Sequence, residues 1–497
     1  MNPARTDIFI PMGRLARVGI VLYCIFWVWC PYVISSIMAP SVSDGVTAAS
    51  IFCFSLIQCA LLFPFFRREV GGIAIGWLHP LVFPTLLALG IQLIKDPSVL
   101  LGLYRAFSME NLPAEHRAIL IYSPQKLAEA DLLRLALTLL AQVAYLSAFM
   151  YLRPLKGTRQ PKTYTVVNKA FRLAVLVLLG VFVWLMINGG GVTAYFSRLA
   201  YGRAQAAMDA GGALIILVRA LPFVLMLWAS ANRRLFRSPE FWVLAATSVL
   251  AVFLTTGSRS YIFVTLAGFM TVWMLAERKI PAVGGIILLC GGSLLLGTLA
   301  DLRSSAIHNG GRADFTVLTQ VFDVRNAVER TQVNVDANDS VRGDLAIFAT
   351  VPNSVHHLWG QSYLGAVGFF VPRAIWQDKP RSVGAFVGAV IYDDMPNTTG
   401  YLGAGYPAGG VAEAFWNFGV AGVLVVFLAF GAFHKRVTQW FLEAPLDPLR
   451  RAMYVTILLM FQEPSSEEFI PIAQITIIVL LVSYFGIRPE KKRVFNN

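Results

Sequence analysis

The sequence predicts an all-α protein that crosses a membrane many times, and three observations predict it. Hydrophobic residues make up 57% of the 497 residues and charged residues only 14%, whereas an average soluble domain carries about 25% charged residues. The mean hydropathy is +0.63. The third observation is a series of long apolar stretches along the whole chain. This composition excludes a soluble multidomain enzyme, a disordered scaffold and a disulfide-rich secreted module.

A helix needs about 20 apolar residues to cross a bilayer core, and twelve stretches approach that length. They lie near residues 17–37, 46–66, 71–94, 133–152, 173–190, 213–231, 240–256, 260–277, 281–300, 410–433, 451–462 and 469–487. The eleventh is short and suits a half-inserted helix, which ends at the polar break from Gln462 to Glu468. The sequence contains no repeat of 20–50 residues and no linker, so we expect one membrane domain over residues 1–497.

Loop charge predicts the orientation, because cytoplasmic loops carry an excess of Lys and Arg. With the N-terminus in the cytoplasm, 24 of the 41 Lys and Arg residues fall on short cytoplasmic segments, and both termini are cytoplasmic. Topology therefore accounts for the net charge of +13, and nucleic acid is not an expected partner. The five cysteines all lie within apolar runs, which indicates neither a disulfide framework nor a cysteine metal site.

The largest predicted extracytoplasmic loop is residues 301–409, between the ninth and tenth spans. Loops of this length are usually functional or disordered, and its many aromatic residues argue against disorder. Helical pieces are expected at 313–334 and 342–358. The apolar stretch from Tyr363 to Ile375 is too short to span and suits a helix that lies in the membrane interface or re-enters it.

The short, basic cytoplasmic loops contain no Walker A sequence and leave no room for a nucleotide-sugar transferase domain, which favours chemistry on the outer face. An enzyme there needs a substrate that carries its own leaving group, and a lipid-linked pyrophosphate is the obvious type. Guanidinium groups bind phosphate oxygens in pairs, although a single arginine also suits an interfacial anchor. The candidate arginines on the outer face are Arg198, Arg203, Arg259, Arg303 and Arg373. Arg219 lies within the sixth predicted span, where a charge needs a partner or a water-filled cavity.

Two segments of the sequence resemble a known family. Residues 371–380 contain Pro-Arg-x-x-Trp-x-x-Lys-Pro, and residues 409–419 contain Glu-x-x-x-Asn-x-Gly at the start of the tenth predicted span. Both are similar to segments of the Wzy-type O-antigen polymerases, also called oligosaccharide repeat unit polymerases, as is the Thr-Gly-Ser-Arg turn that ends at Arg259. An Arg-x10-Gly spacing described in some members is met by Arg373 and Gly384, but residues 191–212 lack the other copy.

This resemblance implies a metal-independent membrane glycosyltransferase of GT-C-like architecture in the bacterial inner membrane, without a cofactor. It implies transfer of a growing glycan from undecaprenyl pyrophosphate to the non-reducing end of a lipid-linked repeat unit. The partners would be these lipid-linked glycans, membrane lipids and a Wzz-type chain-length regulator. The arginines named above would stabilise the departing pyrophosphate, and Trp376 and Lys379 would line the sugar path.

The acceptor hydroxyl must also lose a proton, and more than one residue could serve as the general base. His356 and His357 end the helix expected at 342–358, and histidine is the side chain that changes charge near neutral pH. Glu413 stands where the large loop enters the tenth predicted span. Asp378 is beside Lys379 and suits an ion pair better.

Two other functions stay open at this point. An O-antigen ligase would use the same donor but a lipid A core as acceptor. A twelve-span transporter or lipid-linked glycan flippase would move its substrate without a reaction. Transporters are commonly built from internal repeats, and the sequence has none, which disfavours the second alternative.

Overall fold

The computed structural model describes residues 8–38, 42–94, 123–153, 164–191, 212–256, 260–280, 343–371, 375–391 and 408–489. Within these ranges almost all secondary structure is helical, and eight helices are long and apolar enough to cross a membrane. The chain is therefore an all-α membrane protein, as the composition predicts. The count of twelve spans and the full extent of the large loop stay predictions.

The first two predicted spans are confirmed as helices. The first consists of α1 (Arg14–Tyr23), the π-helical η2 (Cys24–Trp29) and α2 (Cys30–Ile37), which follow one another without a break. Helix α3 (Asp44–Leu62) is the second. The fourth predicted span is α7 (Pro124–Tyr151), and the hydroxyl of its N-cap Ser123 accepts a hydrogen bond from the backbone of the first turn.

The third predicted span, 71–94, is wrong as a single helix. Its first residues belong to two short antiparallel strands, β1 (Glu69–Val70) and β2 (Ile73–Ala74), and the two glycines between them have φ of +58° and +77°. Helix α4 (Phe83–Ile94) then has only 12 residues. Left-handed glycines form the tight turn, and Pro80 disfavours a helix before α4.

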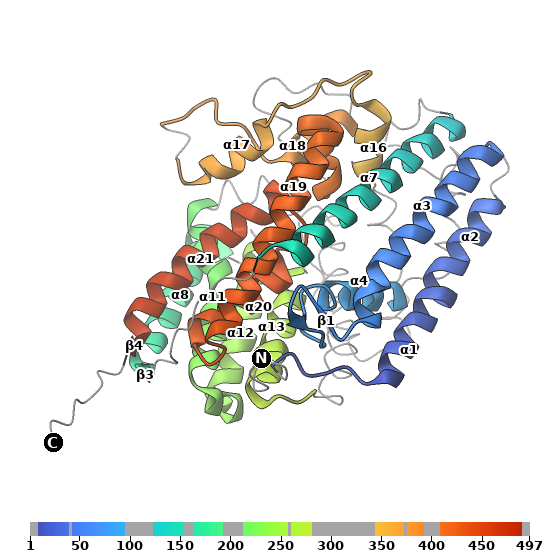
Figure 1. Ribbon diagram of the computed structural model, residues 1–497. Helices are drawn as coiled ribbons and strands as arrows, with labels where there is room; N and C mark the ends of the chain where they lie inside the picture. The colour runs from blue at the N-terminus through green and yellow to red at the C-terminus, as the bar shows by residue number, and fades with distance from the viewer. Residues whose placement is uncertain are drawn as a thin grey trace, which may run out of the picture.

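Predicted spans five to seven are confirmed as α8 (Asn168–Asn188), α11 (Gly212–Ala231) and α12 (Pro239–Thr256). The eighth is an apolar helix, α13 (Ser260–Glu277), that is not among the eight candidate spans. The ninth, 281–300, lies outside the described residues. The 18-residue apolar window of α11 is 72% buried, more than in any of the other seven candidate spans. Helix α11 is therefore the most buried of the candidate spans, and it packs against α8, α12, α13, α20 and α21 (Figure 1).

The last helices contain two departures from regular geometry. Helix α19 (Gly410–Glu443) bends where Phe418 has φ −140° and Gly419 has φ +64°. Helix α20 (Pro448–Met460) has only 13 residues, and α21 (Ser466–Gly486) begins after five non-helical residues. The predicted eleventh stretch is therefore a short helix, and a break does precede the twelfth, although Ser466 to Glu468 of the predicted break already belong to α21.

Strand pairing and ion pairs show which helix ends lie together. Strand β3 (Tyr164–Val166), before α8, pairs with β4 (Ile487–Pro489), after α21. Near the start of α8, Arg172 binds Glu240 at the start of α12, with 2.7 Å between nitrogen and oxygen. We call this end of the bundle the strand end.

The opposite end carries three short helices and is here called the loop end (Figure 1). They are α16 (Gly343–Thr350), α17 (Gln361–Val367) and α18 (Val383–Ile391). The helix expected at 342–358 therefore stops at Thr350. The helix expected from Tyr363 is present as α17, followed by a 3-10 turn. The piece expected at 313–334 lies outside the described residues.

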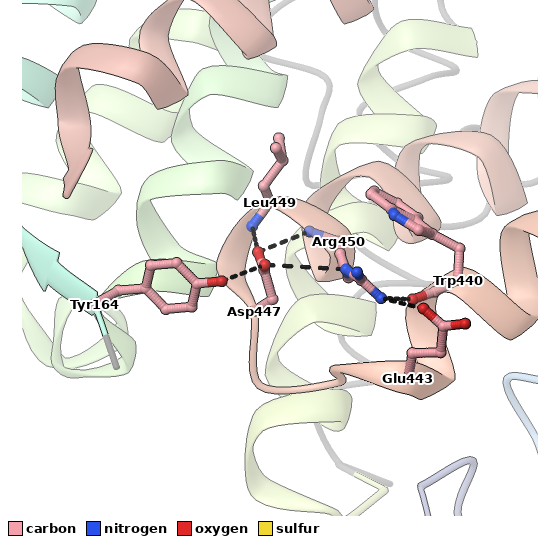
Figure 2. A network of polar contacts seen from close by, with 6 residues as sticks. All are labelled: Tyr164, Trp440, Glu443, Asp447, Leu449 and Arg450. Carbon is pink, nitrogen blue, oxygen red and sulfur yellow. Dashed lines mark hydrogen bonds and ion pairs between the residues drawn. The ribbon is translucent and has the colours of Figure 1, made fainter. Parts of the chain in front are cut away.

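A polar network fixes the strand end where α19 leads into α20 (Figure 2). Asp447 caps α20, and its Oδ2 accepts a 2.7 Å hydrogen bond from the hydroxyl of Tyr164 on β3. Arg450 donates to the backbone oxygen of Trp440 and lies 3.2 Å from Oε2 of Glu443. These contacts join the strand pair to the turn between the two helices.

Candidate functional site

Glu413, in the first turn of α19, joins three segments at the loop end. Its side chain is fully buried, and Oε1 accepts a 2.6 Å hydrogen bond from the hydroxyl of Ser362 on α17. Its Oε2 accepts a 2.8 Å bond from the backbone N–H of Ser466, the first residue of α21. The first N–H groups of a helix have no partner within the helix and favour a negative charge. The carboxylate therefore holds α17 and α21 against α19.

Asn417, one turn further along α19, completes this arrangement. Its Nδ2 donates to Oγ of Ser362 and to the backbone oxygen of Glu413, both at 2.8 Å. Its Oδ1 accepts a 2.9 Å bond from the N–H of Gly360, just before α17. The amide is fully buried. We call Glu413, Asn417, Ser362, Ser466 and Gly360 the Glu413 clamp.

The bend in α19 lies two residues after Asn417, at Gly419. Gly419 has φ +64° and ψ −153°, a backbone conformation that is essentially confined to glycine. Beyond it, Gly422 lies so close to the first part of α19 that an added Cβ would be 2.5 Å from the backbone oxygen of Ala414. All three defined residues of the Glu-x-x-x-Asn-x-Gly segment therefore shape the start of α19.

His357 is attached to the same helix through Trp416, which is buried. The backbone oxygen of Trp416 lies 3.0 Å from Nδ1 of His357, and the indole N–H donates to the backbone oxygen of His356 at 3.0 Å. A carbonyl only accepts, so a neutral His357 carries its proton on Nδ1 and keeps a lone pair on Nε2. The side chain of His356 is exposed. Of the two predicted histidines, only His357 is held at α19 through its imidazole ring.

Trp376 and Lys379 close a turn after α17. Lys379 Nζ donates to the backbone oxygen of Val371 at 2.9 Å, and its N–H donates to the backbone oxygen of Trp376 at 3.3 Å. The indole ring covers Gly368, where an added Cβ would be 2.7 Å from the ring. These contacts stabilise the turn, and the role of both residues in a sugar path stays a prediction.

Arg219 is the one predicted arginine among the described residues. Its guanidinium carbon lies 5.5 Å from the ring centroid of Tyr261, in the first turn of α13, which gives the intramembrane charge an aromatic partner. Its Nε is buried and has no hydrogen-bond partner within the described ranges. The predicted site residues Arg198, Arg203, Arg259, Arg303 and Arg373 lie outside them.

An apolar cavity of about 310 Å³ lies beside the Glu413 clamp and was not predicted. Its walls come from α17, α19, α21 and the non-helical residues before α21, and Tyr363 and Ser466 connect it to the clamp. No local pattern relates segments that lie so far apart in the sequence. Among the described side chains, no three His, Cys, Asp or Glu residues gather to hold a metal ion.

Comparison with known protein families, with curated proteins and with solved structures finds no match for the chain. The described residues define an all-α membrane protein with three short helices, α16, α17 and α18, at one end of the bundle.

Proposed function

We propose that the chain is a metal-independent glycosyltransferase that polymerises undecaprenyl-pyrophosphate-linked repeat units at the periplasmic face of the bacterial inner membrane. The observation that carries the proposal is the Glu413 clamp, which fixes α17 to the start of α19, where Trp416 also holds His357. A polymerase needs its long loop held rigidly over a membrane-level substrate, because correct orientation supplies much of the rate. In this orientation the loop end is periplasmic and both termini are cytoplasmic.

Of the candidate bases, His357 fits the chemistry best. Its Nε2 takes the proton of the acceptor hydroxyl while the acceptor oxygen forms a bond to C1 of the donor sugar. The bond between C1 and the pyrophosphate oxygen breaks, and the arginines stabilise the leaving group. Glu413 acts as a positioning residue, because its carboxylate is fully buried and both oxygens accept hydrogen bonds from the clamp.

The apolar cavity supports a lipid-linked substrate. It opens between α17 and the spanning helices α19 and α21, with Phe430, Phe433 and Phe469 among its lining residues. Apolar pockets with a few polar groups at one side are typical of ligand sites. A hydrocarbon chain in this cavity would bring its pyrophosphate toward the clamp.

Incubation of purified full-length protein with a synthetic undecaprenyl-pyrophosphate repeat unit tests the proposal. We expect a ladder of products, with and without a chelator. His357→Gln should lower the rate by about 10²–10⁴-fold, the usual contribution of a general base, while the matched variant His356→Gln leaves the ladder intact. Arg259→Ala and Arg373→Ala should abolish long products, and Lys at either position should rescue poorly.

The same assay separates the alternatives. Transfer to an added lipid A core without a ladder would identify a ligase. Movement of the lipid-linked unit across vesicles without any new glycosidic bond would identify a flippase. Either result contradicts the proposed polymerase.

A further inference from the structure

A buried arginine, Arg451, lies at the strand end, away from the Glu413 clamp. Arg451, near the start of α20, has a relative exposure of only 7%. One guanidinium nitrogen donates to the backbone oxygen of Pro445 at 3.1 Å. Its Nε is buried and meets no hydrogen-bond partner among the residues that the structure describes. A buried guanidinium with an unused donor is costly unless an anion is close.

Two further arginines follow helices that pack against α20. Arg233 follows α11, and Arg278 follows α13. Burial and the positive charges of Arg233 and Arg278 lower the pKa of Arg451 to about 10, whereas Asp447 acts in the opposite direction. Both neighbours are exposed. Arg233 lies 4.0 Å from Glu277, the residue before Arg278, so the two exposed arginines are neighbours in space. Together with the buried Arg451 they form a group of three cations at the strand end.

The nearby carboxylates do not neutralise this group. Asp447 is committed to capping α20 and to Tyr164, and Glu443 lies 3.2 Å from Arg450 (Figure 2). Glu277 is 4.0 Å from Arg233, which is a long and exposed ion pair. Among the described residues, repulsion among the three arginines is therefore opposed only in part, by the charge of Asp447 and by the long contact with Glu277.

We propose that Arg451, Arg233 and Arg278 bind a phosphate group at the strand end. Guanidinium groups hold phosphate oxygens through paired, charge-assisted hydrogen bonds, and the exposed Arg233 and Arg278 offer such donors close to the buried charge of Arg451. Arg278 has φ of +53°, a conformation that non-glycine residues adopt rarely and mainly where the surroundings impose it. The phosphate comes either from the headgroup of an anionic phospholipid or from free phosphate. This site does not depend on the proposed polymerase activity.

Native mass spectrometry of the detergent-solubilised full-length protein tests the site. The protein is titrated with phosphatidylglycerol, and with phosphatidylcholine of the same acyl chains as a headgroup control. Arg278→Gln and Arg451→Gln should each weaken phosphatidylglycerol binding by about fivefold, because a Lys or Arg near an anionic headgroup contributes about 1 kcal/mol. Arg488→Gln removes an exposed arginine from β4 at the same end and should leave binding unchanged.

A competition experiment with inorganic phosphate identifies the source of the phosphate group. Displacement of phosphatidylglycerol by inorganic phosphate shows that the site accepts free phosphate, and no displacement shows that it needs the lipid headgroup. The site is refuted if Arg278→Gln binds phosphatidylglycerol as Arg488→Gln does. Arg278 is exposed, so this comparison holds even if the buried Arg451 variant fails to fold.

Discussion

Replacement of Asn417 by alanine tests whether the Glu413 clamp holds the loop to the bundle. The variant removes an acceptor for the N–H of Gly360 and two donor interactions, with Ser362 and with the backbone of α19. The helix remains intact because alanine has the highest helix propensity. The expected effect is therefore confined to the attachment of α17.

The magnitude follows from the three lost contacts. A buried donor left without a partner costs about 1–3 kcal/mol, and each lost hydrogen bond costs about 1 kcal/mol. Only the contacts with Gly360 and Ser362 attach α17, so their loss costs this attachment about 2–4 kcal/mol. Local opening of α17 should then become at least about thirtyfold more frequent, since about 1.4 kcal/mol corresponds to a factor of ten.

Hydrogen exchange of the amides of residues 361–367 measures this opening directly. We expect much faster exchange in Asn417→Ala, and little change in α8. The matched control is Asn188→Ala, whose amide makes one exposed hydrogen bond within α8. If the amides of α17 exchange at the same rate in both variants, Asn417 does not hold α17 against α19, and the clamp as described is wrong.

Three further predictions concern thermal unfolding in detergent. Gly431→Ala places a Cβ 2.3 Å from a backbone oxygen of α7, so it should cost about 1–3 kcal/mol, whereas Gly180→Ala meets nothing within 4 Å and should not lower the Tm. Burial lowers the pKa of His79 from 6.5 to about 3. The folded protein therefore keeps this histidine neutral at pH 5, whereas the unfolded chain binds a proton. The free energy of unfolding is unaffected above pH 6.5 and decreases as the pH falls below it. At pH 5 the loss is about 2 kcal/mol, and His79→Gln should reduce the fall in Tm between pH 7 and pH 5. Asp447→Ala removes the cap of α20 and the bond to β3 and should cost more than Tyr164→Phe, which loses about 1 kcal/mol; equal losses would contradict the network.

Hydropathy predicts most of the fold because a helix in lipid must satisfy its backbone internally and present apolar side chains. It fails at residues 71–94 because the apolar residues there face protein. Val70 and Ile73, on the two short strands, are only 3% and 4% exposed. Apolar content alone does not distinguish burial against other helices from contact with lipid.

The site is only partly readable from the sequence. Glu413 is identifiable by its place at the start of a predicted span, but its partners Ser362 and Ser466 are 51 and 53 residues away. Hydrogen bonds over such separations leave no local periodicity. The run Ser465–Glu468 did carry a signal for the start of α21, since Ser followed three residues later by Glu is a capping pattern, and the N-cap hydroxyl accepts from Glu468.

The non-helical residues between α20 and α21 are stabilised by specific contacts. Helix α20 ends at Met460, and the backbone oxygen of Phe461 lies 2.9 Å from Nε2 of His434. Since that oxygen only accepts, Nε2 carries the proton, and Nδ1 accepts from the hydroxyl of Tyr145 at 2.8 Å. Non-helical backbone at membrane depth is tolerated where protein or a cavity surrounds it. Here the buried His434 donates to the backbone oxygen of Phe461. Other residues of the same non-helical segment line the apolar cavity beside Glu413. Phe461, Pro464 and Ser465 belong to this irregular segment and line the cavity, so the irregular backbone forms part of the wall of the space in which we propose that a lipid chain binds.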